Sequence, residues 1–294
     1  MARTQAISML SGASTPASLA EIYGLVIENV QKSTLSTALK SNQYTGNPAA
    51  GSVEFTRFSN ATPKDYGTAR AAGKGDKVVA KPITVNLSTH REIIEEVAKF
   101  DLETFGVPDI MRRRADNHAL RMAADLDSAF FAAGVAEGTA FTPASGVTNI
   151  QDIMESWIQT LETIKNEHVD GVDRNMMALV LSPEKYGLLR TFLDTQANPN
   201  VNTAAEEFGL YHGVKVYSCT RLPVTTSGSG ETLKTTTTNG LLMVTGSIAQ
   251  PVVTNPYGEP EKIPLSNDFA VEMFYDYGTK VLTPDLVLKW TVTA

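Results

Sequence analysis

Residues 53–87 read VEFTRFSNATPKDYGTARAAGKGDKVVAKPITVNL, and this stretch decides what kind of fold the chain can have. Its two ends, 53–58 and 77–87, alternate apolar with polar side chains, which is typical of β-strands. The segment 60–82, which overlaps the start of the second end, holds one tyrosine, two valines and no other large apolar side chain. An isolated two-stranded ribbon is only marginally stable in water. We therefore predict an extended loop at 51–87 whose apolar side chains lie on another subunit, namely Val53, Phe55, Phe58, Ile83, Val85 and Leu87.

The glycines of this loop suggest a phosphate-binding loop, but their spacing does not fit one. Gly67 and Gly73 are separated by five residues rather than the four of the P-loop motif, and Lys74 is followed by Gly75 rather than by Ser or Thr. The hydroxyl that would bind Mg²⁺ is therefore missing. We interpret the glycines as joints that let the two limbs bend, because glycine adopts backbone conformations that other residues avoid.

The composition is that of a folded, acidic protein. The chain has 294 residues, of which 42% are hydrophobic and 19% charged, enough for one large or two ordinary domains. Its net charge of −7 argues against nucleic-acid binding over the whole surface, which needs a basic surplus. The single cysteine, Cys219, excludes an intrachain disulfide and a Cys-rich metal site. With no secretory signal pattern and no apolar window of about 18 residues, we expect a protein of the reducing cytoplasm.

The first half of the chain is predicted to hold an arm and two helices. Residues 1–50 are rich in Ser, Thr, Ala and Asn and show helical spacing only between 19 and 30. Thr89 opens a capping-box pattern that predicts a helix at 92–104. A longer helix is predicted at 108–133, because Pro108 favours a first helical turn and Gly134 a helix end.

The second half mixes helices and strands. Apolar residues at helical spacing predict a helix from 150 to 164, and a second helix is predicted to begin at Pro183. The Ser/Thr/Gly-rich segment 224–240 is predicted to be a loop with too little apolar surface to pack. The fold class is α+β, with strands predicted at 176–182, 214–218, 241–245, 252–255, 270–275 and 286–292.

No residue pattern in the chain is typical of catalysis, cofactor binding or metal binding. The four histidines are scattered outside any metal-ligand spacing, and we interpret them as surface or cap residues: His90, His118, His168 and His212. The Gly-x-Ser-x-Gly motif of serine hydrolases does not occur. Three successive arginines, Arg112, Arg113 and Arg114, cannot all face one ligand on a helix, so solvation of the helix end or contacts with acidic groups of a neighbouring chain are favoured over nucleic-acid binding. We expect a protein that is not an enzyme.

The order of these pieces is distinctive. An arm, a long polar β excursion, a long helix and a compact α+β block are followed by closing strands in FAVEMFYDYGTKVLTPDLVLKW at 269–290. This order resembles the major capsid proteins of tailed bacteriophages, which have the Hong Kong ninety-seven fold. The closing segment is similar to the last peripheral-domain strands of that family. GVKVYSCTRLP at 213–223 and GLLMVTGSIAQPVV at 240–253 are similar to its axial-domain strand pair.

The resemblance implies a division of the chain and a function. It implies an N-terminal arm at 1–50, an extended loop at 51–87, a peripheral domain at 88–144 with a spine helix at 108–133, an axial domain at 145–265 and returning peripheral strands at 266–294. The implied function is self-assembly, as hexamers and pentamers, into the icosahedral head shell of a virion that encloses double-stranded DNA without binding it tightly. Because Met1 directly precedes the arm, we expect a separate scaffolding protein, together with a portal protein and optionally a decoration protein, and assembly in the host bacterial cytoplasm.

Charge predicts where two subunits meet. Residues 60–81 hold five basic and two acidic residues, a net of +3, whereas 92–104 hold five acidic residues and one lysine, a net of −4. Our hypothesis is that the basic loop lies over the predicted acidic helix of a neighbour. The expected contact residues are Lys64, Arg70, Lys74, Lys77, Lys81, Phe55 and Phe58 of the loop, Glu92, Glu95 and Glu96 of the helix, and the three arginines.

Two alternative functions and one additional reaction stay open at this point. An encapsulin, a bacterial protein compartment, shares the fold but encloses an enzyme instead of a genome. A soluble α+β enzyme or binding module is the more remote alternative, and it predicts a small particle rather than a shell. Some relatives also cross-link a loop lysine to an asparagine of a neighbour, for which Asn255 and Asn267 are the candidates here.

Overall fold

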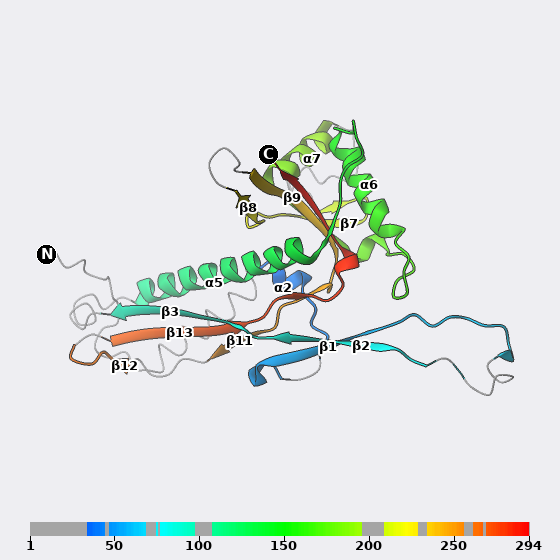
Figure 1. Cartoon of the computed structure of the whole chain (residues 1–294). Helices are drawn as coiled ribbons and strands as arrows, with labels where there is room; N and C mark the ends of the chain where they lie inside the picture. Colours follow the sequence, from blue (N-terminus) through cyan, green and yellow to red (C-terminus); the bar gives the residue numbers. More distant parts are fainter. Residues whose placement is uncertain are drawn as a thin grey trace.

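The structure is a computed structural model that describes residues 34–44, 47–68, 75, 77–97, 108–195, 209–228, 234–255, 261–266 and 269–293. Figure 1 shows an elongated lower layer and a compact upper block. In the lower layer, the hairpin of β1 (Ser52–Phe58) and β2 (Ala80–Asn86) extends away from a sheet that contains β3 (Thr89–Val97) and β13 (Phe269–Tyr277). Helix α5 (Pro108–Glu137) runs along that sheet and ends under the upper block.

The upper block is built on a mixed sheet with helices packed against it. The strand order is β4 (Thr139–Ala140), β15 (Val287–Thr293), β9 (Lys234–Val244), β5 (Met177–Leu181), β7 (Val214–Ser218) and β6 (Leu210–Tyr211), and β8 (Val224–Ser227) also pairs with β9. Helices α6 (Ile150–Glu162) and α7 (Pro183–Thr195) lie on one side of this sheet, as Figure 1 shows. The end of α5 and the short α2 (Ser36–Leu39) lie on the other side. A sheet covered on both faces needs strands that are apolar on both faces.

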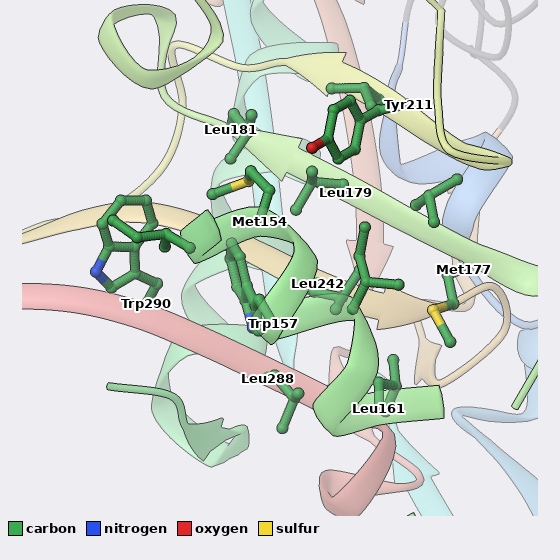
Figure 2. Close-up of a cluster of buried hydrophobic side chains, with 14 of the residues drawn as sticks. Met154, Trp157, Leu161, Met177, Leu179, Leu181, Tyr211, Leu242, Leu288 and Trp290 are labelled. Atoms are coloured by element: carbon green, nitrogen blue, oxygen red, sulfur yellow. The ribbon is translucent and has the colours of Figure 1, made fainter. Parts of the chain in front are cut away.

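Strand β5 meets that requirement, because all five of its side chains are buried. Met177, Leu179 and Leu181 point to the α6 side, whereas Ala178 and Val180 join the cluster on the α5 side, as the two-residue period of a strand dictates. Figure 2 shows the α6 cluster, in which Met154, Trp157 and Leu161 face Leu242, Leu288 and Trp290. These α6 residues recur at helical spacing, so one helix face enters the core.

The lower sheet is antiparallel and is covered by a helix on one side. Strand β13 pairs with β3 along nine residues, from Phe269↔Val97 to Tyr277↔Thr89. On its other edge it pairs with β11 (Val252–Asn255) and β12 (Glu261–Lys262). The short pair β10 (Ile248–Ala249) and β14 (Lys280–Val281) lies beside the end of α5. None of the helices described has the length and apolarity needed to span a lipid bilayer.

The buried carboxylate of Asp127 ties two distant parts of the chain to α5. It accepts hydrogen bonds from the backbone N–H groups of Leu35 (3.3 Å) and Ser36 (2.9 Å) at the start of α2. It also pairs with the Arg221 guanidinium, with 2.6 Å between Nη1 and Oδ2. A carboxylate at a helix N-terminus satisfies donors that have no partner within the helix. The last part of the arm is thereby fixed to α5.

The predicted helix at 92–104 is wrong over the residues that the structure describes, because 89–97 form strand β3. Isoleucines at 93 and 94 and a valine at 97 suit a strand as well as a helix, and β-branched residues favour the strand. The deciding factor is β13, an apolar strand that lies along β3 over its whole length. Residues 98–104 lie outside the described residues, as does the predicted helical segment 19–30.

Two further expectations change. The described residues of the predicted loop at 224–240 form two antiparallel strands, β8 and β9, because its threonines are β-branched and pair across the strands from Val224↔Thr237 to Ser227↔Lys234. Helix α5 continues past Gly134 to Glu137. A Cβ at Gly134 would lie 3.1 Å from Cδ1 of Ile248, so this glycine allows close packing rather than ending the helix.

The two segments compared with an axial strand pair contain β7 and β9, which are not neighbours, because β5 lies between them. The predicted return segment 266–294 is also divided between the two sheets. Strand β13 belongs to the lower sheet, whereas β15 pairs with β9 in the upper one. The remaining predicted elements of the second half agree with α6, β5, α7, β7 and β11.

Candidate subunit interface

The inner half of the extended hairpin is packed on its own chain. Strands β1 and β2 pair from Ser52↔Asn86 to Phe58↔Ala80. Val53, Phe55 and Val85 are buried in a cluster with Ala249 and with Leu282, and the Tyr44 ring meets that of Phe55 edge-on, with 5.8 Å between centroids. The expectation that the apolar residues of the hairpin lie on another subunit is therefore wrong for Val53, Phe55, Val85 and Leu87, all buried in this chain.

The backbones of the hairpin and the lower sheet also meet closely. A Cβ at Gly278 would overlap the carbonyl oxygen of Asn86, so only glycine fits at this crossing. Nearby, the Lys280 ammonium donates to the carbonyl oxygen of Thr84 at 3.2 Å. The base of the hairpin is thus fixed by backbone contact as well as by its apolar cluster.

An arginine follows the two buried residues on the same face of β1. Arg57 is two residues beyond Phe55, and both of its terminal nitrogens donate to the carboxylate of Asp285, each at 2.8 Å. Asn166 donates a further hydrogen bond to Oδ2 of Asp285 at 2.7 Å. Asp285 lies in the single turn η4 (Pro284–Leu286), immediately before β15. Bidentate arginine–carboxylate pairs are among the stronger and more directional polar contacts in proteins.

The turn that carries Asn166 binds the hairpin backbone as well. Asn166 Oδ1 accepts from the N–H groups of His168 and Val169, both at 2.9 Å, which fixes the shape of the turn. Nδ1 of His168 donates to the carbonyl oxygen of Phe58 at 3.1 Å, and the N–H of Asn60 donates to the carbonyl oxygen of Glu167 at 2.9 Å. Residues 57–60 are therefore bound to two separate parts of the chain.

The outer half of the hairpin, residues 61–79, begins where these contacts end. Its described residues are exposed apart from a half-buried Gly67, and Tyr66 is 98% exposed. At its border Phe58 is 57% exposed, in contrast to 5% for Phe55. Lys64, Lys77 and Lys81 are exposed on the two limbs, whereas Arg70 and Lys74 lie outside the described residues, and the predicted contacts of all five stay a prediction. A basic, solvent-facing segment with exposed aromatic rings is the part of the hairpin available to another molecule.

The outer face of the β3–β13 pair is acidic with two apolar side chains in it. Glu92 and Glu96 are exposed there, and Ile94 between them is 48% exposed. Phe274, opposite Glu92 across the strands, is 38% exposed. At the end of the same face, Nδ1 of His90 lies 2.7 Å from Oδ1 of Asp276. We call this surface, made of Glu92, Ile94, Glu96 and Phe274, the acidic sheet face.

The other face of the same strands turns toward α5, and this corrects the prediction for Glu95. Because successive side chains of a strand alternate in direction, Glu95 points away from Glu92 and Glu96. Its Oε1 lies 3.1 Å from Nε2 of His118, which is buried rather than at the surface as the sequence suggested. Glu95 is therefore bound within the subunit, and of the three predicted acidic contacts only Glu92 and Glu96 remain available.

Helix α5 is held over this inner face by a second carboxylate. Asp125 accepts hydrogen bonds from the hydroxyls of Tyr275 (3.0 Å) and Tyr277 (3.2 Å) and lies 3.4 Å from Nε of Arg91. Burial raises the pKa of the Tyr275 hydroxyl, and the nearby negative charge of Asp125 adds to the shift. Arg112, Arg113 and Arg114 are on α5, but their side chains lie outside the described residues, so their predicted contacts stay a prediction.

Sequence reasoning missed the polar group made by Arg57, Asp285, Asn166 and His168. One local signal was present, since Val53, Phe55 and Arg57 share one face of β1 and an arginine that continues a buried face needs a partner. The partner itself could not be found locally, because Asp285 lies 228 residues further along the chain. Ile94 and Phe274 were missed because the wrong secondary structure was assigned to residues 92–97.

Comparison with known proteins gives a family match over most of the chain. Residues 91–290 match the family model described as phage capsid protein. A solved chain from Mycobacterium phage Che8 is 18% identical, with a TM-score of 0.55, and the match covers 99% of this chain and 96% of that one. The capsid of cyanophage P-SCSP1u gives 12% identity, a TM-score of 0.59 and coverage of 99% and 91%.

A third solved structure, a virus-like particle from Pyrococcus furiosus, is 12% identical, with a TM-score of 0.55 and coverage of 92% and 97%. A search of curated proteins finds no match. At these identities the solved structures establish only that the folds are similar. The assignment to a family rests on the match of residues 91–290 to the family model.

Proposed function

Because the chain belongs to the phage capsid protein family, its function is to form the shell of a phage head, and we propose that its copies join through the outer half of the hairpin. In this proposal, residues 61–79 of one subunit lie on the acidic sheet face of a neighbour. The family and the α+β fold of the Hong Kong ninety-seven type are those that the sequence predicts. The acceptor surface is a strand face rather than the helix that the sequence suggested.

The observation that carries this proposal is the division of the hairpin into a bound half and an exposed half. The inner half is buried against its own chain, whereas Lys64, Tyr66 and Lys77 are exposed. The acidic sheet face offers carboxylates and exposed apolar side chains on one surface. Basic and aromatic groups on one copy thus complement acidic and apolar groups on another, which favours correctly oriented encounters.

Each of these contacts is weak, and the number of copies makes the sum large. An exposed ion pair contributes about 0–1 kcal/mol and is screened by salt. Weak individual contacts allow a wrongly placed subunit to leave, whereas linked contacts in a closed shell act together. We expect shell formation to be favoured at low ionic strength for this reason.

The finer features of the function are also part of the proposal. We propose an icosahedral shell of hexamers and pentamers around double-stranded DNA, with separate scaffolding and portal proteins and optionally a decoration protein, assembled in the host bacterial cytoplasm. The net charge of −7 supports a container that does not hold DNA tightly. We assign the lower sheet with α5 to the peripheral domain and the upper block to the axial domain, and we propose no catalytic activity and no cofactor.

Charge reversal tests how the subunits join. Lys64→Glu with Lys77→Glu should leave the subunit folded, by circular dichroism, but prevent shells in negative-stain electron microscopy. Adding Glu92→Lys and Glu96→Lys should restore shells, because the attraction is rebuilt with opposite signs. The matched control is Lys215→Glu with Lys234→Glu, which makes the same change of net charge at exposed lysines of the upper block. Normal shells from the Lys64/Lys77 variant would contradict the proposed contact.

The content of purified particles tests the encapsulin alternative, which is supported by the similarity to the virus-like particle from Pyrococcus furiosus. Particles from infected cells should contain double-stranded DNA if the protein forms a phage head. A stoichiometric protein cargo without DNA would favour a protein compartment.

A further inference from the structure

The contacts at residues 57–60 stand at the point where the hairpin leaves the body. On the inner side, Val53 and Phe55 are buried in the subunit. On the outer side, residues 61–66 are exposed. Arg57, whose side chain is 19% exposed, is the last residue of β1 that faces the body. The direction of the outer half is therefore decided over these few residues.

The partners of residues 57–60 come from two places in the chain, and these two places are joined to each other by a hydrogen bond. Asp285 is in the turn before β15. The first two residues of β15, Val287 and Leu288, are buried in the two clusters of the upper sheet. The turn at 166–168 follows α6, and its Asn166 hydrogen bonds to Asp285. The hairpin is thus held from its side-chain face by Asp285 and along its backbone by His168 and Glu167.

We propose that Arg57, Asp285, Asn166 and His168 form a latch that fixes the angle at which the hairpin leaves the body and thereby selects the curvature of the shell. The second part of this inference rests on the proposed function, in which the hairpin joins neighbouring copies. A lever held at its base transmits a small rotation to its far end as a large displacement. The position of the contact on the neighbour then depends on the latch, although no latch residue touches that neighbour.

The lowered pKa of Asp285 agrees with an ion pair between its carboxylate and Arg57. Burial alone would raise the pKa of this carboxyl, but hydrogen bonds from Arg57 and Asn166 outweigh burial and hold the pKa below its usual value. Asp285→Asn keeps the shape of the side chain and removes the charge, so it weakens the bidentate contact without opening a cavity. It is therefore the most selective variant for the test.

The first measurement is made on unassembled subunits of the full chain. Spin labels at Tyr66→Cys, in the exposed outer half, and at Glu137→Cys, at the exposed end of α5, report the angle of the hairpin. The native Cys219 is buried and should stay unlabelled. Asp285→Asn should broaden the distribution of distances between the two labels. An unchanged distribution would overturn the latch.

The second measurement is made on assembled shells by electron microscopy. Asp285→Asn should replace a single shell diameter by a range of diameters, and unchanged diameters would overturn the role in curvature. The matched control is Glu184→Gln in α7, which likewise removes one negative charge, here from an ion pair with Lys185 in which the Glu184 side chain is 75% exposed. It should change neither the distances nor the diameters.

A pair of variants tests the latch even if Asp285→Asn does not fold. Arg57→Asp with Asp285→Arg exchanges the two groups and should restore a narrow distance distribution relative to Arg57→Asp alone. No restoration would count against the pair. The distances are measured without neighbours, so they test the latch even if the Lys64/Lys77 variant shows that the hairpin does not join the copies.

Discussion

The two halves of the hairpin at 52–86 are parts of one continuous segment and have opposite surroundings. In the inner half, the exposed fraction of Phe55 is 5% and its ring packs within the subunit. Only three residues further along, the exposed fraction of Phe58 is 57%, and that of Tyr66 in the outer half is 98%. Strand β1 therefore has one face in a core and the other face exposed.

This difference shows that composition alone does not assign a side chain to a core. Phe55 and Phe58 differ by an odd number of positions, so they point to opposite faces of β1. Only the face that carries Val53, Phe55 and Arg57 lies against the body. A segment can therefore be half structural and half available for assembly, and separate substitutions should affect the two properties separately.

The largest expected effect is the loss of the buried ring in the inner half. Phe55→Ala should lower the free energy of unfolding of the unassembled subunit by about 3–5 kcal/mol, because it removes a buried aromatic side chain and leaves a cavity. Urea denaturation measures this change. The paired variant Phe58→Ala should leave stability nearly unchanged and impair assembly instead. Equal stability losses from the two variants would abolish the distinction between the halves.

A smaller effect is expected where the hairpin crosses the lower sheet. Gly278→Ala should destabilise the subunit by about 1–3 kcal/mol, because the added methyl group would overlap the carbonyl oxygen of Asn86 and force the backbones apart. Thermal unfolding measures the shift. Gly75→Ala in the outer half is the control, since nothing lies within 4 Å of its added Cβ. A neutral Gly278→Ala would mean that the inner half is not closely held.

The smallest expected effect is the pH dependence at the border between the halves. The pKa of Asp285 is lower in the folded chain than its usual value, so its stabilising effect is present above that usual value. It is lost as the pH falls through the lower, folded-state pKa. The difference in unfolding free energy between the native chain and Asp285→Asn should therefore shrink as the solution is acidified, in urea titrations at several pH values. A difference that grows on acidification would contradict the ion pair.

Local patterns were sufficient to predict much of the fold. The stripe of Met154, Trp157 and Leu161 predicts α6, and the uniformly apolar segment at 176–182 predicts β5. Residues 92–97 were assigned wrongly because their pattern suits two structures, and the choice depends on pairing with β13, which lies far along the chain. The burial of Phe55 depends in the same way on Ala249 and Leu282.

The candidate interface was predicted by charge and corrected by geometry. Lys64, Lys77 and Lys81 are exposed as expected, because lysines on a segment without apolar neighbours remain in water. Glu95 was misplaced because the direction of its side chain follows from a strand period rather than a helical one. The latch could not be predicted, since its four side chains come from three separate parts of the chain.

Strands β2 and β3 are joined by only two residues, Leu87 and Ser88, and Figure 1 shows them nearly in line. Leu87 is buried, so this short link is anchored to the body. In the proposed shell, β2 belongs to the hairpin that contacts one neighbour, and β3 carries the acidic sheet face that a second neighbour contacts. The two contacts are therefore joined by one stretch of backbone. Tension applied at either end passes along a single covalent line from subunit to subunit. A closed ring of such subunits would carry tensile stress along these linked backbones, and internal pressure would increase that tension.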